Sequence, residues 1–179
     1  MYKGTNKTAL ASKKHIADAF LKLLHETPYS DISISAICKA AGVSRQTFYS
    51  IFESKENIIL FELCFKNSFQ PGAECKKPHL SLEDLSHEYT HYIIEKQEVL
   101  TLLVQNDIIY MMHKSLSETF FNCVCFQPNL PEEQRMYAAE FVACGLFGIA
   151  KVYITEGKKL SQDELYEIIH SLLGGTALG

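Results

Sequence analysis

Residues 33–55 read Ser-Ile-Ser-Ala-Ile-Cys-Lys-Ala-Ala-Gly-Val-Ser-Arg-Gln-Thr-Phe-Tyr-Ser-Ile-Phe-Glu-Ser-Lys, and this stretch decides the fold. Apolar residues at positions 34, 37 and 41 have the spacing of one helix face. Gly42 follows, where a helix that ends in a left-handed residue favours a side chain without Cβ. Ser44 can then cap a second helix by accepting a backbone N–H from Gln46 or Thr47. Two short helices joined by a tight turn predict a helix-turn-helix.

The second of these helices divides its side chains between two faces. Phe48, Ile51 and Phe52 share one face and are expected in the core, which leaves polar groups largely outward. Guanidinium, amide, hydroxyl and phenol groups suit base edges and phosphates. We expect four of them to face the major groove, and three further residues to contact phosphates. The groove residues are Arg45, Gln46, Thr47 and Tyr49; the phosphate residues are Ser33, Ser50 and Lys55; Ser35 and Ser44 complete the predicted DNA-binding set.

Lys55 needs a reason for its position. Ser54 is the expected N-cap of the next helix, so Lys55 falls in its first turn, where a cation opposes the helix dipole. A bound phosphate would explain the ammonium group, because a helix N-terminus with a nearby cation attracts anions. The alternative is an ordinary solvated lysine.

The run from 40 to 56 resembles the N-terminal signature of TetR/AcrR-type bacterial transcriptional regulators. The resemblance is specific over roughly residues 9–63, and length and helical pattern agree over the rest. Gln46 stands where the family often has glycine, and its amide could read adenine. Ile51 stands where a phosphate-contacting histidine is frequent, so one expected contact is missing. The resemblance implies a dimeric repressor that is released from DNA by a small ligand.

Charge is unevenly distributed along the chain. Residues 1–60 hold eight Lys/Arg against five Asp/Glu, net +3, and residues 61–179 hold nine against sixteen, net −7, which together give the overall −4. A basic head on an acidic body is expected when only one end meets phosphate. Three further features predict a cytoplasmic protein with buried free thiols. The N-terminus is polar, the longest uncharged apolar run spans only residues 141–150, and the six cysteines form no CxxC pair.

The pattern predicts an all-α protein of about nine helices, because alternation of period two is absent. A three-helix helix-turn-helix DNA-binding domain is expected over residues 1–54, with its recognition helix at about 45–51. A larger regulatory, effector-binding and dimerisation domain is expected over 55–179. The predicted helices outside the helix-turn-helix lie at 9–26, about 55–69, 132–156 and 161–174, with two or three more between 81 and 125.

The last two helices carry more apolar surface than a plain amphipathic exterior needs. They could be a central core helix with its cover, or a face that pairs with a second copy in a four-helix bundle. We favour the homodimer, because palindromic operators demand two-fold symmetry. Leu146 and Leu172 are the positions that we expect in this interface.

The run His87-Glu88-Tyr89-Thr90-His91 matches the zinc-protease pattern H-E-x-x-H. The extended pattern would need histidine at position 97, which is Gln97, so we expect no metal ligands and no cofactor. Cys123 and Cys125, with His113 ten residues before the first, are a weaker metal or redox candidate.

The sequence thus predicts a DNA-binding transcriptional regulator of palindromic duplex operators, a repressor with a small-molecule effector. The alternatives are a metal-dependent hydrolase that uses residues 87–91, or an adaptor of the same fold without DNA binding. The effector residues and the operator sequence are not predicted. An aromatic or lipophilic pocket is compatible with the segment 82–126, but aromatics at helical spacing are more often core; the side chains concerned are Tyr89, Tyr92, Tyr110, Met111, Met112, Phe120 and Phe121.

Overall fold

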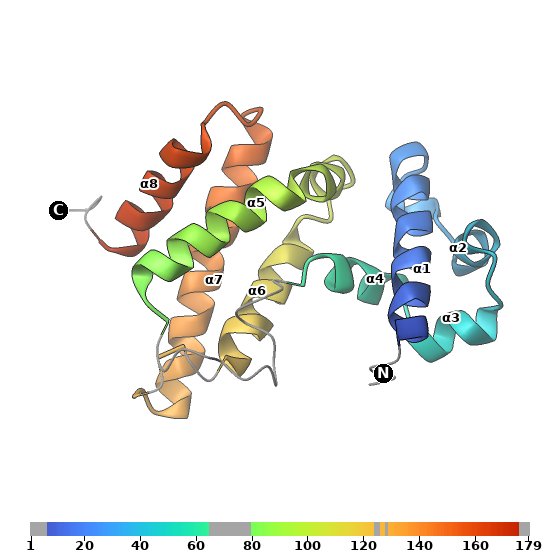
Figure 1. Ribbon diagram of the computed structural model, residues 1–179, viewed down its shortest axis with the longest axis horizontal. Coiled ribbons are helices and arrows are strands. Elements are labelled where there is room, and N and C mark those ends of the chain that lie inside the picture. Colours follow the sequence, from blue (N-terminus) through green and yellow to red (C-terminus); the bar gives the residue numbers. More distant parts are fainter. Residues whose placement is uncertain (1–6, 65–79, 124–125, 128, 176–179) are drawn as a thin grey trace. The chain divides into compact units, whose positions relative to one another are not determined.

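The structure is a computed structural model that describes residues 7–64, 80–123, 126–127 and 129–175. This part of the chain forms eight α-helices and one short 3-10 helix, and it contains no strand (Figure 1). The all-α prediction is confirmed, and two helices lie between 81 and 125, where two or three were expected. The elements are α1 (Lys7–Glu26), η1 (Tyr29–Asp31), α2 (Ile34–Ala41), α3 (Arg45–Ile51), α4 (Lys55–Glu62), α5 (Leu82–Gln105), α6 (Tyr110–Asn122), α7 (Glu132–Thr155) and α8 (Gln162–Leu173).

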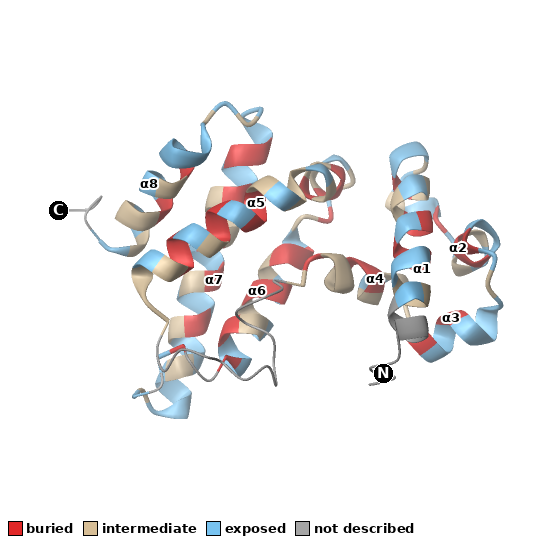
Figure 2. Ribbon diagram, in the orientation of Figure 1, coloured by how far each residue is buried: buried red, intermediate tan, exposed pale blue. Residues whose placement is uncertain are grey.

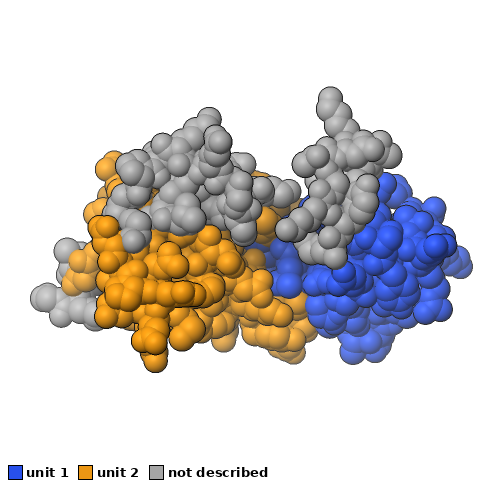
Figure 3. All heavy atoms as spheres, turned by 90° about the horizontal axis from the view of Figure 1, so that it is seen from below, with its two compact units in different colours: residues 1–63 blue, residues 64–179 orange. Residues whose placement is uncertain are grey.

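The chain divides into two compact units, residues 1–63 and residues 64–179 (Figure 3). The boundary therefore follows α4, whereas the sequence placed it before this helix, at residue 54. α4 packs on α1, it buries Ile58 and Ile59, and the Phe61 ring lies 5.6 Å from that of Phe52. α4 is also shorter than predicted, because Leu63 already has ψ near zero and caps the helix; residues 65–69 lie outside the described part.

The first unit is built around α1, which packs against α2, α3 and α4. Ile16, Phe20 and Leu24, four residues apart, are all buried, as their spacing predicts. Figure 2 shows that α1 alternates buried and exposed segments along its length. Phe48 of α3 is fully buried in the same core. Removing a buried phenylalanine ring costs about 3–5 kcal/mol of stability in other proteins. The burial of Phe48 therefore holds this side of α3 against the core.

Local capping signals produce the turns between the helices of the first unit. The side chains of Ser33, Ser44 and Ser54 each accept a hydrogen bond from the backbone N–H of the residue three positions later, with N···O distances of 3.1, 3.0 and 3.3 Å. Gly42 ends α2 with φ 63°, the left-handed conformation that glycine adopts without strain. The sequence predicts the caps at Ser44 and Ser54 and the left-handed Gly42, and these predictions are confirmed; the cap at Ser33 is a further one that the structure shows.

In the second unit, α7 packs against α5, α6 and α8, and α5 also packs against α8. The buried Tyr89 hydroxyl of α5 donates a hydrogen bond of 2.8 Å to the Leu146 carbonyl of α7. Burial raises the pKa of the Tyr89 phenol well above its usual value, so it stays a donor. A capping box of Ser161 and Glu164 opens α8.

Most of the aromatic and methionine side chains of the 82–126 segment form the core of this unit. Tyr110 and Phe121 are the exposed members, and the other five side chains of the set are buried: Tyr89, Tyr92, Met111, Met112 and Phe120. This arrangement matches the packing alternative for the segment.

One face of α7 is left uncovered by the rest of the described chain. Phe141 is 76% exposed and Val152 59%, and Leu172 of α8 is 43% exposed. α7 is long and apolar enough to cross a membrane by length and composition, yet only 33% of its most apolar stretch is buried within the protein. Leu146, in contrast, is fully buried, so the expectation that it lies in an interface is wrong: its side chain belongs to the core of its own chain.

Candidate nucleic-acid interface

The helix α3 has the division of faces that the sequence predicts. Phe48 and Ile51 are buried, whereas all five polar side chains of the helix are exposed: Arg45, Gln46, Thr47, Tyr49 and Ser50. Because Ile51 packs in the core, a phosphate contact from this position is not available. The polar groups project from a helix that is held rigidly by its buried side.

Hydrogen bonds within α3 organise this outward face. The Ser44 and Thr47 hydroxyls lie 2.8 Å apart, and the Ser50 hydroxyl donates to the Thr47 carbonyl at 2.8 Å. Tyr49 lies one helical turn after Arg45. A hydrogen bond between the two side chains raises the pKa of the Arg45 guanidinium, so this group keeps its positive charge. Such mutual support keeps exposed side chains in fewer rotamers and lowers the entropy lost on binding.

Two serines of the adjoining helix α2 also face solvent. The Ser33 oxygen accepts the Ala36 N–H at 3.1 Å, which leaves its hydroxyl hydrogen able to donate to a phosphate oxygen. Ser35 is exposed one residue inside the helix. Both positions stay predictions as phosphate contacts.

Lys55 has a different environment from the one that the sequence suggests. Its ammonium donates to the Tyr29 carbonyl at 2.7 Å and to the Ile32 carbonyl at 3.2 Å. It also lies 4.0 Å from the centre of the Tyr29 ring, within the range of a cation–π contact. Lys55 thus ties the start of α4 to the turn around η1, which accounts for a cation in the first turn of the helix without a phosphate. A phosphate contact remains a prediction that must compete with these bonds.

Tyr29 is a residue of this region that the sequence reasoning did not single out. Besides receiving Lys55, it donates its hydroxyl to Glu56 Oε1 at 2.6 Å. Partial burial raises the pKa of the Glu56 carboxyl, but the Tyr29 hydrogen bond and others outweigh it and the net shift is downward. The only local signal was its place after Pro28 in a turn, and its partners are 26 and 27 residues away.

The other motifs singled out in the sequence are not brought together. The His87 ring stacks on Tyr166 at 4.3 Å between ring centres, and His91 lies 3.8 Å from Glu95. Among the described residues, no third metal-binding side chain converges on this pair. Cys123 is buried as expected, Cys125 lies outside the described residues, and Cys144 is exposed, contrary to the expectation of buried thiols.

Comparison with known proteins matches the N-terminal part of the chain to bacterial regulators. Residues 16–60 match the family described as bacterial regulatory proteins, tetR family. The HTH-type dhaKLM operon transcriptional activator DhaS of Lactococcus lactis is 36% identical over 63 residues, or 35% of this chain and 33% of the relative. The chain thus aligns with about a third of the length of that curated relative.

Solved structures agree over nearly the whole chain. The structure of the dihydroxyacetone kinase operon activator DhaS has a TM-score of 0.57 at 21% identity and covers 93% of this chain and 96% of its own. A crystal structure from Listeria innocua has a TM-score of 0.77 at 13% identity, over 98% and 96% of the two chains. These likenesses show a shared fold, and the matched segment 16–60 contains α2 and α3 entire. Over residues 16–60, the chain thus carries the N-terminal domain of the tetR family of bacterial regulatory proteins.

Proposed function

We propose that this protein regulates transcription by binding a palindromic duplex operator, with α3 of each copy in a major groove. The observation that carries the proposal is the exposed polar face of α3 on a helix whose other face is buried. An amide such as Gln46 can pair with adenine in two hydrogen bonds, and a guanidinium such as Arg45 can pair with guanine or phosphate. The net charge of +3 over residues 1–60 adds a modest attraction to the phosphate backbone.

A homodimer through α7 and α8 is the second part of the proposal. The uncovered side chains of these helices are apolar, and a groove of about 580 Å³ between them is lined by Val152, Ile168 and Leu172, among others. A Cβ added at Gly145 or Gly148 would meet no atom within 4 Å, so this stretch of α7 is open to a second helix at short range. Apolar surface of this extent is stabilised when another copy covers it, and a two-fold axis suits a palindrome.

The direction of regulation is proposed as repression that a small molecule relieves. A ligand that binds better to the DNA-free arrangement would shift the population away from the operator. The relative DhaS is an activator by name, so an activator is the second candidate. We place the protein in the cytoplasm, where its operator would be.

Selection from random duplexes tests DNA recognition directly. The purified protein should enrich a sequence with two inverted half-sites, and Arg45→Ala should abolish the enrichment because it removes a charge from the α3 face. Lys114→Ala, which removes an exposed charge of the second unit, is the matched control and should enrich the same sequence. If the unmodified protein enriches no duplex, the adaptor without DNA binding replaces this proposal.

A reporter gene behind the selected sequence then decides the direction of regulation. Lower expression with the protein present supports a repressor, and higher expression supports the activator.

A further inference from the structure

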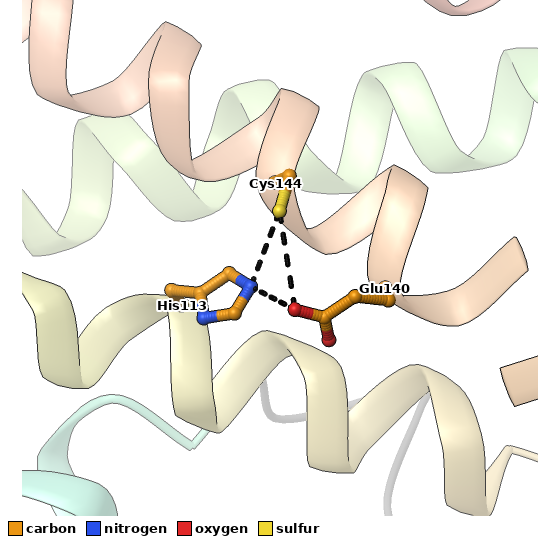
Figure 4. A group of neighbouring side chains, drawn as sticks. All are labelled: His113, Glu140 and Cys144. Atoms are coloured by element: carbon orange, nitrogen blue, oxygen red, sulfur yellow. Dashed lines mark hydrogen bonds and ion pairs between the residues drawn. The ribbon is translucent and has the colours of Figure 1, made fainter. Parts of the chain in front are cut away.

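Three side chains of the second unit bring a nitrogen, an oxygen and a sulfur atom together (Figure 4). His113 comes from α6, and Glu140 and Cys144 stand one turn apart on α7. His113 Nε2 lies 2.8 Å from Glu140 Oε1 and 3.3 Å from Cys144 Sγ, and the sulfur lies 4.0 Å from the same carboxylate oxygen. Among the described residues, this is the group of three or more potential ligands whose atoms converge.

The size of this triangle fits a tetrahedral ion. Zinc binds thiolate, imidazole and carboxylate at about 2.0–2.3 Å, so two ligand atoms on one zinc lie roughly 3.4–3.6 Å apart. The observed separations of 2.8, 3.3 and 4.0 Å lie on both sides of that range. The largest difference is about 0.6 Å, and small side-chain rotations would remove it. The His113 and Glu140 side chains are 30% and 50% exposed, so an ion can reach them.

Neighbouring residues already orient two of the three groups. The Ser117 hydroxyl donates to Glu140 Oε2 at 2.6 Å, which leaves Oε1 directed at the histidine and the cysteine. The Phe147 ring meets the His113 ring edge to face at 6.1 Å between centres. Metal-binding carboxylates are commonly held by hydrogen bonds such as the one from Ser117, which raises affinity by limiting their motion.

We propose that His113, Glu140 and Cys144 form a binding site for a divalent ion of the zinc class. Calcium and magnesium prefer sites built from oxygen alone, whereas the mixture of imidazole, carboxylate and thiolate suits zinc. Three protein ligands leave a fourth position for water or for a group of another molecule. A bound ion joins α6 to α7, and it lies beside the uncovered face because Cys144 also lines the groove between α7 and α8.

Titration of the untagged protein with zinc, in competition with a chromophoric chelator, measures the site. We expect one zinc per chain. Cobalt in place of zinc should give a charge-transfer band from the thiolate, which reports the Cys144 ligand without any substitution. Absence of stoichiometric zinc binding, or cobalt bound without a thiolate band, overturns the proposal.

Variants assign the ligands. Cys144→Ser and His113→Ala should each weaken zinc binding by more than the ~10–100-fold that the loss of an outer partner causes, and Ser117→Ala should fall within that range. His91→Ala, which breaks an exposed His–Glu pair without a cysteine, should leave the affinity unchanged. Thermal unfolding confirms that each variant is folded. If zinc survives the His113 and Cys144 changes, or is lost only with His91→Ala, the site is not the one proposed.

Discussion

The helices α3 and α7 each bury one face and leave the other uncovered, but the two uncovered faces differ in chemistry. The uncovered face of α3 carries hydroxyl, amide, guanidinium and phenol groups, which hydrogen-bond to water until another polar surface replaces that water. The uncovered face of α7 carries Phe141, Val152 and glycines, whose apolar surface is unfavourable in contact with water. Exposure alone therefore does not identify a partner: the first face fits nucleic acid, and the second fits another apolar face.

A charge on the α7 face should have the largest effect. Phe141→Glu would place two carboxylates in the proposed interface, and each uncompensated charge costs on the order of several kcal/mol. Sedimentation should therefore show a monomer at micromolar concentration, and operator affinity should fall by at least ~100-fold, which corresponds to about 2.7 kcal/mol. Phe121→Glu changes an exposed aromatic residue of α6 and is the control. A dimer that survives Phe141→Glu but not the control would move the interface to α6.

Lys55→Ala should have the next largest effect, and it acts on stability. It removes two hydrogen bonds from an ammonium group, each worth about 1.5–3 kcal/mol when well buried and less at this partly exposed site. Urea unfolding of the protein should show the loss, and Lys39→Ala, an exposed lysine of α2, should leave the midpoint unchanged. The opposite pattern, an unchanged midpoint with a weaker salt dependence of operator binding, would restore the phosphate contact.

Gln46→Ala should act on specificity rather than on folding. The side chain is exposed on α3, so the midpoint of unfolding should not change. Discrimination at one base pair of each half-site should fall by about 1–3 kcal/mol. Binding to a set of operators with single base changes measures this. A uniform loss over all these operators would assign Gln46 to the backbone instead of to a base.

Gly148→Ala should give the smallest effect, and its sign depends on the assembly state. Alanine favours a helix interior by about 0.8–1 kcal/mol over glycine, and the site has room for a methyl group within one chain. In the monomeric Phe141→Glu background the substitution should therefore raise the unfolding midpoint. In the unmodified chain it should weaken the dimer, because the methyl group would hold the two helices apart. A gain in both backgrounds would show that no helix approaches here.

Features that depend on neighbouring residues were predictable from the sequence. The caps at Ser44 and Ser54, the left-handed Gly42 and the capping box at Ser161 follow from contacts over three or four residues, and all are present. The buried side of α3 was predictable for the same reason, since helical period alone places Phe48 and Ile51 together.

Features that depend on distant residues were not predictable. Lys55 finds carbonyl groups 23 and 26 residues away, and a first-turn lysine gives no sign of them. Leu146 looked equivalent to other apolar residues of its helix, but it is fully buried within its own chain. Cys144 meets His113 across 31 residues, and only the register between α6 and α7 brings them together.

The glycines of α7 carry a consequence for the amount of protein in a cell. Each lowers the helical stability of the isolated chain by about 0.8–1 kcal/mol relative to alanine. If a second copy covers this face, the folded fraction rises with protein concentration, because association withdraws folded chains from the unfolding equilibrium. Chains made in small numbers would then spend more time unfolded and accessible to proteases. Abundance would thereby set the lifetime of the regulator, so that a scarce regulator is also a short-lived one.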